Sequence, residues 1–510
     1  MLSQPGFATR LRNFEVDPDG GYRRIDGFTE FGDTRPNSSE GILGMTVYAD
    51  GVVVCSGTGI FFSQDGTSWL QINRASVSGS GDNYSTFTGR SVAARTSQGR
   101  CTFALYEGTS DYGELVICDG VNEPFLFQMT GTDADITNRT FFAKEITVSG
   151  TTGPAVGVIH DKHLVVAGAS TAKNTIFYSS TNDIDSFTGS GAGRIVIEDA
   201  VVGLASFRSD LIIFCKNSIH KLVNINNSST VAVVPITTNV GCVSGGSIQE
   251  IGGDLLFLSP DGVRTVAGTA RIGDVELGSV SRQIQSLISD IAADSEFVIT
   301  SGVLRSKSQY RLFYSKVGES PTIAKGIIGT LTSNGFAWSE TLGIQALGFV
   351  SDLDKDGIEQ VYHGDKDGYI YNHISGNAFR SAGSARDIDA VYQTPDFDFG
   401  DVGTRKTLKY ARVSFSPEGA VEPSFRVRYD YEDPDRPQPE PFAVTTIALP
   451  AIFGTSAFNA VTFGATTDPM ERITLEGSGN TCSFRITSED QKSAYAVNGL
   501  YIDYMPSGRR

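Results

Sequence analysis

Seven hairpin patterns, spread between Val52 and His373, constrain the fold of this 510-residue chain more than any other feature. Each pattern is an apolar run, a tight turn of polar residues or glycine, and a second apolar run. They read VVVCSGTGIFFS, ELVICDGVNEPFLF, HLVVAGASTAKNTIFYSS, LIIFCKNSIHKLV, LLFLSPDGVRTV, YRLFYSKVGESPTIAKGIIGTL and QVYHGDKDGYIYNH. Six steps separate the turn at Gly59 from the turn at Lys366, so one period is about 51 residues. Such a period in strand-rich sequence is typical of a β-propeller, whose hairpins stack on their neighbours in a ring.

The array divides the chain into three predicted parts. Residues 1–40 are polar and loop-like, and residues 41–380 predict a β-propeller of six or seven blades. Residues 381–510 lose the repeat and alternate apolar with polar residues, as in YARVSFS and SFRVRYDY. This alternation predicts antiparallel strands with one solvated face, and hence a β-sandwich interrupted by a proline-rich loop. The predicted fold class is therefore all-β.

Two local patterns stand out within the array. The turns Asp65-Gly66-Thr67-Ser68-Trp69 and Asn334-Gly335-Phe336-Ala337-Trp338 end in the only two tryptophans of the chain, and they resemble the Asp-box hairpins of many propellers. We expect each indole ring to pack between adjacent sheets. The segment SRQIQSLISDI, residues 281–291, spaces its apolar residues for one amphipathic helix with Ser281 as N-cap.

Composition excludes some classes of function. Forty-one Lys and Arg against 58 Asp and Glu give a net charge of −17, which argues against general binding to nucleic acid but not against a channel that DNA passes without adhering. No signal peptide is visible, and no apolar stretch is long enough to span a bilayer. The six cysteines lack metal-binding spacing and are expected to be reduced and buried.

The sharpest chemical motif is an acidic loop with Asp352, Asp354 and Asp356 at alternate positions, followed by Gly357 and Glu359. Carboxylates at this spacing before a glycine resemble the start of a calcium loop. The loop lacks the twelfth-position acid of an EF-hand, and is closer to the calcium hairpins of integrin-like propellers. The four acids are therefore a candidate calcium site, and a solvated acidic turn is the alternative.

Signals for an enzyme are weak. His160 and His163 flank Asp161 but have no identifiable third ligand, so structural roles are favoured. The usual hydrolase and nucleotide-binding motifs are absent from the sequence. A propeller with Asp-box-like turns raises the alternative of a sialidase, which would need a Tyr nucleophile and an arginine cluster. No catalytic residue is predicted.

Four arginines make the N-terminal segment locally basic: Arg10, Arg12, Arg23 and Arg24. One interpretation is an interface with an acidic partner or a neighbouring subunit. The other is pairing within the chain to the interleaved acids Glu15, Asp17, Asp19 and Asp26. The sequence leaves both open.

Several blocks together resemble one known family. These are RNFEVDPDGGYRRIDGFTEFG, ELVICDGVNEP, HDKHLVVAG, YSSTNDIDSFTG, SFRSDLIIFCKNSIHKL, GCVSGGSIQEIGGDLLFLSPDGVRTV, HGDKDGYIYNH and DFDFGDVGTRK. The chain is similar to the tail nozzle proteins of short-tailed (podovirus) phages, also called tail tubular protein B or packaged-DNA stabilisation protein. The resemblance extends to about residue 415, and the last hundred residues carry little of it.

The resemblance implies a non-enzymatic virion protein, assembled in the host cytoplasm as part of the phage tail. It implies a homo-hexamer that extends the DNA channel below the portal and an adaptor ring (tail tubular protein A-like), retains packaged double-stranded DNA and releases it on infection. Residues 1–40 and 381–510 would form a platform domain, and fibre, spike or needle proteins would be further partners. A carbohydrate-binding or sialidase-like propeller of a tail receptor-binding protein is the alternative, and calcium the one possible cofactor.

Overall fold

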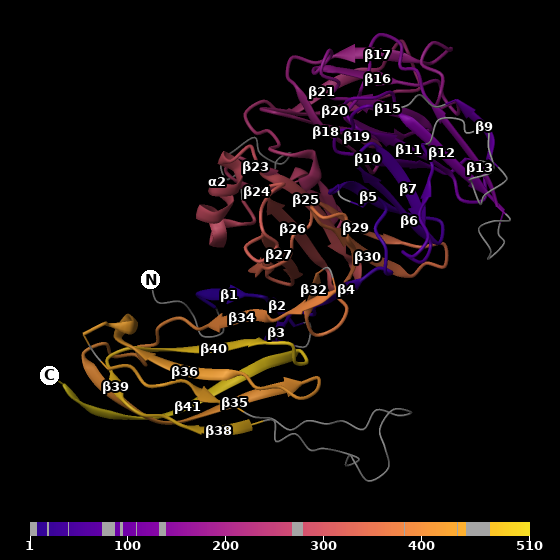
Figure 1. Ribbon diagram of the computed structural model, residues 1–510. Helices are drawn as coiled ribbons and strands as arrows, with labels where there is room; N and C mark the ends of the chain where they lie inside the picture. Colours follow the sequence, from indigo (N-terminus) through magenta and orange to yellow (C-terminus); the bar gives the residue numbers. More distant parts are fainter. Residues whose placement is uncertain are drawn as a thin grey trace.

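The computed structural model describes residues 8–17, 20–38, 40–73, 87–91, 95–108, 110–131, 139–267, 279–381, 383–435, 437–444 and 470–509. It is mostly β-structure, in two parts (Figure 1). The larger part is a propeller-like ring of antiparallel sheets, and the smaller one is a pair of sheets built from the two ends of the chain.

Four sheets make up the first half of the ring. The first contains β5 (Ile42–Tyr48), β6 (Gly51–Ser56), β7 (Gly59–Ser63) and β8 (Leu70–Gln71). The second contains β10 (Thr102–Tyr106), β11 (Glu114–Cys118), β12 (Phe125–Thr130), β13 (Thr140–Glu145) and β9 (Phe87–Ser91). The third contains β14 (Val156–His160), β15 (His163–Ala167), β16 (Thr175–Tyr178) and β17 (Gly193–Val196). The fourth contains β18 (Val201–Phe207), β19 (Asp210–Cys215), β20 (Ile219–Val223) and β21 (Ala232–Thr237).

Three further units complete the ring. The fifth follows η2 (Gly245–Ser247) and contains β22 (Gln249–Ile251), β23 (Asp254–Ser259) and β24 (Gly262–Thr265). The sixth contains β25 (Val298–Leu304), β26 (Gln309–Ser315), β27 (Lys325–Thr332) and β28 (Gly335–Leu342), with η4 (Arg305–Lys307) between its first two strands. The seventh contains β29 (Gly348–Leu353), β30 (Glu359–Gly364), β31 (Ile370–His373), β4 (Phe28–Glu30), β32 (Phe379–Ser381) and β33 (Ser384–Arg386).

The seven predicted hairpins are the second and third strands of these seven units. The first strand of each unit contacts the first strand of the next, η2 making this contact for the fifth unit, and β29 of the seventh returns to β5 of the first. Among the described residues, seven apolar clusters form the core, one at each junction between neighbouring units. The sheets therefore bury both faces and close into a circle.

The N-terminal strand β4 completes the last unit of the ring. It pairs antiparallel with β31, with Tyr371 opposite Glu30 and His373 opposite Phe28. The ring therefore does not begin at residue 41, as the hairpin array suggested, because its seventh sheet combines strands from both ends of the array.

The smaller part, here called the platform, is a two-sheet sandwich. One sheet contains β1 (Arg10–Arg12), β34 (Ile388–Gln393), β40 (Cys482–Asp490), β36 (Ser424–Tyr429) and β37 (Phe442–Ala443). The other contains β2 (Phe14–Val16), β3 (Tyr22–Arg24), β41 (Tyr495–Arg509), β35 (Thr404–Pro417), β38 (Met470–Thr474) and β39 (Ser478–Gly479). The 3-10 turn η5 (Asp430–Glu432) follows β36.

Strand β1 joins the platform to the ring. It pairs parallel with β28 of the sixth unit and antiparallel with β34 of the platform, so that a single nine-stranded sheet runs from β25 to β37. One apolar cluster follows the same path, with Phe313 and Phe349 on the ring side and Val413, Phe425 and Ile486 on the platform side. The two parts therefore share a core.

The local predictions in the ring are confirmed with one correction. Trp69 packs in the cluster between the first and seventh units, and Trp338 in the cluster between the fifth and sixth, where its Nε1 donates to the Val280 carbonyl at 2.7 Å. The predicted helix is α2 (Gln285–Ala293), preceded by η3 (Arg282–Ile284), and packs in the same cluster as Trp338. Ser281 is not its N-cap, because its hydroxyl accepts the Val263 N–H at 2.9 Å instead.

Candidate functional site

The acidic loop at residues 352–359 is a hydrogen-bonded turn whose carboxylates point to different partners. Asp354 accepts the backbone N–H groups of Asp356 and Ile358, both at 2.9 Å, and the Gln360 amide at 2.8 Å. The other three acids have different partners. Asp352 faces Arg305, and Asp356 pairs with Lys355. Glu359 accepts the backbone N–H groups of Arg305 and Ser306. Among the residues that the structure describes, no three His, Cys, Asp or Glu side chains are placed to bind a metal ion. The four acids therefore form a hydrogen-bonded acidic turn in this structure, and calcium binding by the loop stays a prediction.

We expect calcium to leave this loop unchanged. Asp354→Ala should lower the free energy of unfolding by about 1 kcal/mol, because the turn loses its acceptor. Titration calorimetry with calcium chloride should give no saturable heat for either protein. A one-to-one calcium heat that Asp354→Ala abolishes would contradict the geometry, and Asp356→Ala, which removes only an exposed pair, is the matched control for stability.

The predicted structural residues of the ring are placed as such. His160 Nδ1 lies 2.8 Å from the Ser206 hydroxyl, and His163 contacts the Ser179 carbonyl at 2.5 Å and the Asn226 amide oxygen at 2.9 Å. All six cysteines are buried and free, and burial raises the pKa of the Cys215 thiol to about 12. These groups hold loops and fill the core.

Four buried arginines of the ring each pair with a separate carboxylate. Arg95 pairs with Asp119 at 3.0 Å and Arg139 with Asp50 at 2.6 Å. Arg264 pairs with Asp261, and Arg311 with Glu15 at 2.7 Å. A sialidase-like site needs several arginines converging on one substrate carboxylate, and these four are committed to separate internal pairs.

The N-terminal arginines are used within the chain at three of the four positions. Arg12 donates to Asp389 at 2.5 Å, and Arg24, with 1% of its side chain exposed, donates to Asp490 at 2.8 Å. Arg23 contacts Glu15, Asp26 and Glu418. Intramolecular pairing thus describes Arg12, Arg23 and Arg24, although most partners are not the neighbours in sequence that we expected. The Arg10 residue is exposed.

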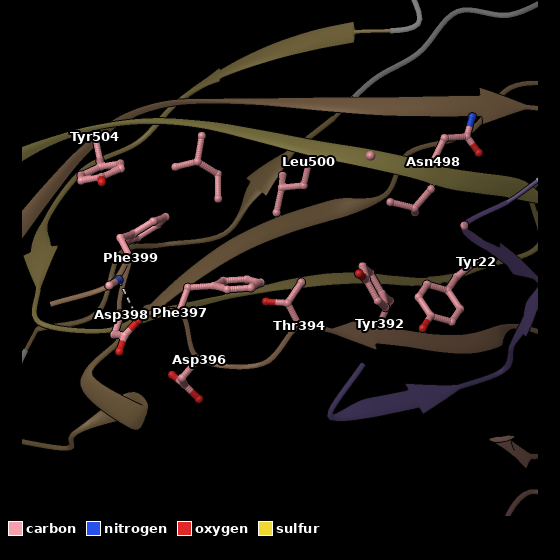
Figure 2. A pocket seen from close by; sticks show the side chains of 15 residues that line it. Tyr22, Tyr392, Thr394, Asp396, Phe397, Asp398, Phe399, Asn498, Leu500 and Tyr504 are labelled. Atoms are coloured by element: carbon pink, nitrogen blue, oxygen red, sulfur yellow. Dashed lines mark hydrogen bonds between the residues drawn. The ribbon is translucent and has the colours of Figure 1, made fainter. Parts of the chain in front are cut away.

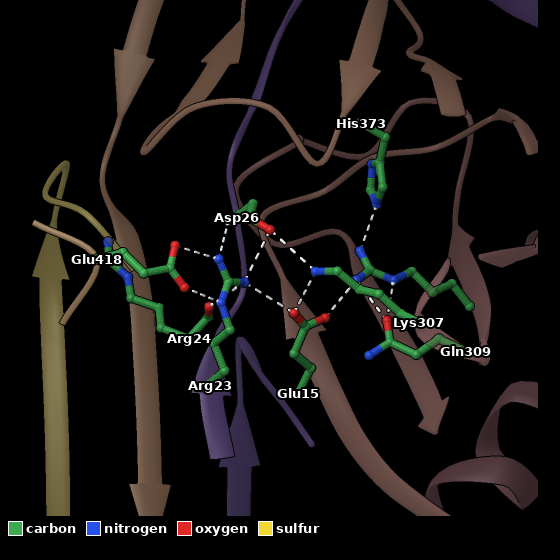
Figure 3. Close-up of polar contacts among 9 residues, drawn as sticks. Glu15, Arg23, Arg24, Asp26, Lys307, Gln309, His373 and Glu418 are labelled. Atoms are coloured by element: carbon green, nitrogen blue, oxygen red, sulfur yellow. Dashed lines mark hydrogen bonds and ion pairs between the residues drawn. The ribbon is translucent and has the colours of Figure 1, made fainter. Parts of the chain in front are cut away.

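A buried charge network, centred on Glu15, lies where the platform meets the ring (Figure 3). One Glu15 oxygen accepts Lys307 Nζ at 2.6 Å and Arg23 at 3.1 Å, and the other accepts Arg311 at 2.7 Å. Glu15 and Arg311 are each 2% exposed. The acid comes from β2, whereas Lys307 and Arg311 come from the sixth unit, so the network ties the N-terminal segment to the ring.

Burial and charge act in opposite directions on Glu15. Burial alone would raise the pKa of this carboxyl, but Arg311 and Lys307 hold it below its usual value. Burial is also the main cause that lowers the pKa of Arg311, against the attraction of Glu15 and Asp26. The charges are therefore balanced only while all members are present.

Two buried histidines extend the network into the seventh unit. His373 Nε2 lies 2.9 Å from Arg311, and its Nδ1 lies 3.1 Å from His363 Nδ1. Burial lowers the pKa of His363 to about 3, and burial with the neighbouring His363 and Arg311 lowers that of His373 well below its usual range. Both rings are neutral in the folded chain at neutral pH.

We expect these histidines to make the fold acid-sensitive. Between pH 6.5 and pH 3 the unfolded chain binds protons that folded His363 does not, so the free energy of unfolding falls as the pH is lowered through this window. Each fully linked proton contributes about 1.4 kcal/mol per pH unit. Urea unfolding at pH 4 to 7 should show this slope, and His363→Gln should flatten it. Equal slopes for the two proteins would refute the assignment.

A groove of about 700 Å³ lies between the two sheets of the platform (Figure 2). Its walls carry aromatic side chains from both sheets. Tyr22 lies 5.1 Å from Tyr392 between ring centres, and Phe399 stacks on Tyr504 at 4.4 Å. Leu500 and Ile502 of β41 add aliphatic surface. No sequence signal marked this groove, because its walls come from segments about 100 and 370 residues apart.

The groove offers apolar contact and little chemistry. Its described lining contains the carboxyls Asp396 and Asp398 but neither histidine nor cysteine. Burial raises the pKa of Asp396, whereas Asp398 accepts the Gly400 N–H at 2.9 Å in a local turn. Burial also raises the pKa of Tyr392 to about 12, so this hydroxyl stays protonated. The groove is therefore better suited to binding a flat or apolar ligand than to catalysing a reaction.

Comparisons with known proteins give only distant structural likeness. No protein-family profile matches the chain, and no curated protein matches it. One similar solved structure is the extracellular domain of a one-component system from B. thetaiotaomicron, with 8% identity and a TM-score of 0.37 over 73% of this chain and 41% of that one. The chain thus spans about two fifths of that protein.

Two further structures illustrate the same distance. The WD40 domain of Neurospora crassa Pan2 has 8% identity and a TM-score of 0.34, over 70% of this chain and 98% of that domain. An exo-β-1,3-galactanase from Phanerochaete chrysosporium has 9% identity and a TM-score of 0.27, over 94% and 100%. At these values the likeness carries no argument about activity, and the propeller-like fold rests on the sheet topology described above. None of the described helices is long and apolar enough to cross a membrane.

Proposed function

We propose that this chain is a structural subunit of the tail nozzle of a short-tailed phage. Six copies would form a tube below the portal and adaptor rings, retain packaged DNA and let it exit on infection. The subunit would be a seven-bladed β-propeller with a platform formed by both chain ends. No catalytic residue belongs to this role.

The observation that carries the proposal is the nine-stranded sheet that runs from the ring into the platform. A tube wall under DNA pressure needs subunits that do not hinge. Hinging here would require breaking the β1–β28 or β1–β34 pairing, opening a shared apolar core and separating the Glu15 network. Such a junction favours a rigid conduit over a receptor that closes on a ligand.

The net charge supports passage of DNA without adhesion. A chain at −17 repels phosphate, and six copies around one bore would do so more strongly. The nozzle role also proposes an adaptor ring above and fibre, spike or needle proteins below as partners, with double-stranded DNA as cargo in the bore. The proposed location is the virion tail, after assembly in the host cytoplasm.

Electron microscopy of the purified chain, alone and with an adaptor ring of a short-tailed phage from the same host, tests the proposal. We expect rings with six-fold symmetry and a central bore, attached to the adaptor through the platform. A chain that stays monomeric and never binds an adaptor would overturn it.

The aromatic groove favours one alternative, a carbohydrate-binding protein of a phage tail. Rings such as Tyr22 and Tyr504 could stack on sugar faces, although they lie in the platform and not in the propeller. Binding to a glycan array that Tyr504→Ala abolishes would favour this alternative, and an inert array would exclude it.

A further inference from the structure

Three arginines and a glutamine form one row across four strands of the platform. In the sheet β1-β34-β40-β36, Arg10 is opposite Gln393, Gln393 is opposite Arg485, and Arg485 is opposite Arg426. Residues directly opposite each other in antiparallel strands project from the same face. Arg428 lies two residues beyond Arg426 on this outer face, and we call these five residues the arginine row.

The row is electrostatically unfavourable in the isolated chain. Like charges directly opposite each other destabilise a sheet. Burial is the largest cause that lowers the pKa of Arg485, and the charges of Arg428, Arg10 and Arg426 lower this pKa further. The protein nevertheless places these arginines side by side although its net charge is −17.

One carboxylate serves most of the row. The Glu432 carboxylate pairs with Arg428. It also lies 3.7 Å from the Arg426 guanidinium and 3.9 Å from that of Arg485. Gln393 accepts from Arg485 at 2.8 and 3.0 Å, which satisfies donors but adds no charge. Among the described contacts, Arg10 has no carboxylate partner, and its residue is exposed. The row therefore keeps a surplus of positive charge.

The acids elsewhere on this face do not neutralise the row. A hollow of about 600 Å³ is lined by Arg10 and Arg485 of the row and, further along, by the acids Asp389, Glu422, Glu489 and Asp490. Asp389 pairs with Arg12, Asp490 with Arg24, and Glu422 with Lys492. Glu489 is exposed at the far end of β40. The face thus has a basic end with too few acids and a second end whose acids are mostly paired.

We propose that the arginine row is the contact surface for a carboxylate-bearing surface of a second copy of this chain. The inference rests on the proposed function, because it names the surface by which one nozzle subunit would hold the next. A second copy fits the row, since each copy carries 17 more acidic than basic residues. Guanidinium groups at strand spacing can each bind a carboxylate in bidentate fashion.

The contact is heterologous. A two-fold contact centred on the row would place arginines against the same arginines, which like-charge repulsion disfavours. The row of one copy must therefore meet a different surface of the next. Repeated heterologous contacts generate a ring when the rotation closes, as a hexamer requires.

Sedimentation velocity across a concentration series tests this inference, at 50 and 300 mM salt. We expect the dissociation constant of wild-type self-association to rise with salt. The double variant Arg426→Glu with Arg485→Glu should raise this constant at least tenfold at 50 mM salt. The Arg426→Lys with Arg485→Lys variant should assemble better than the Glu variant. Arg194→Glu, at an exposed position on β17, is the matched control and should assemble as wild type.

A second readout separates a lost contact from a lost fold. Removing like charges should leave the melting temperature of the Arg485→Gln variant unchanged or raised, while assembly still weakens. The inference is overturned if the Glu variant assembles as wild type, or if wild type stays monomeric throughout. It is also overturned if the row instead binds a double-stranded DNA fragment while self-association is unaffected. If the Glu variant still forms six-fold rings on an adaptor, the proposed function stands and this inference alone is overturned.

Discussion

Glu15→Ala is expected to lower the free energy of unfolding by about 3–5 kcal/mol, because it leaves the buried Arg311 guanidinium without its counter-ion. Arg311 is 2% exposed and cannot reach water without opening the junction between β2 and the sixth unit. Lys307 would retain Asp26, and Arg23 would retain Asp26 and Glu418. Urea unfolding at pH 7, followed by circular dichroism, measures the change.

Glu418→Ala is the matched control for this prediction. Glu418 also contacts Arg23, at 2.5 Å, but half of its side chain is exposed. Water can replace it, so its loss should lower the unfolding free energy by less than about 1 kcal/mol. Equal effects of the two substitutions would mean that the network does not act as a buried unit.

The ring was predictable from the sequence because its signals are local. Each hairpin lies within about 22 residues, and most of the hairpins contain one strand that is buried along nearly its whole length, as in Val52–Cys55 and Leu211–Cys215. The period of about 51 residues then implied stacking. The tryptophans at 69 and 338 were predictable for the same reason, since the turn and the ring it positions are adjacent in sequence.

The junction of ring and platform was not predictable in this way. Strands β1 to β4 have three residues each, too few for a two-residue period to be recognised. Their partners are remote: Arg12 pairs in register with Glu340 and Val391, and Phe28 with His373. The alternation in SFRVRYDY correctly indicated a solvated face, but only the strand register shows that Arg426 and Arg485 share it.

The acidic loop shows that one short motif is compatible with two uses. Asp354 and Gly357 are the residues that a tight turn selects, because a carboxylate accepts nearby N–H groups and glycine adopts the positive φ of 76° found here. The same two residue types begin a calcium loop. Sequence cannot separate the two uses; in the structure each carboxylate of the loop has a partner of its own.

Phe28→Ala is expected to lower the free energy of unfolding by about 3–5 kcal/mol, the range for removing a large aromatic ring from a core. Phe28 is 2% exposed, stacks on Phe379 at 5.1 Å and meets His363 edge-on at 4.6 Å. It anchors β4, the strand by which the N-terminal segment completes the seventh unit. Guanidinium chloride unfolding measures the loss.

The position of Phe28 makes a second outcome specific to ring closure. If β4 holds the seventh sheet, hydrogen exchange in Phe28→Ala should accelerate first in β31 and β32, the strands that pair with β4, and later in distant units such as the third. Phe442→Ala removes an aromatic ring on β37 that is 44% exposed. It should change the free energy of unfolding by about 0.5 kcal/mol and leave hydrogen exchange in β31 unchanged. If a single strand closes the ring, the circle should open at that strand before the other sheets respond. Uniform acceleration of hydrogen exchange around the ring in Phe28→Ala would therefore show that β4 contributes only its share of the common core.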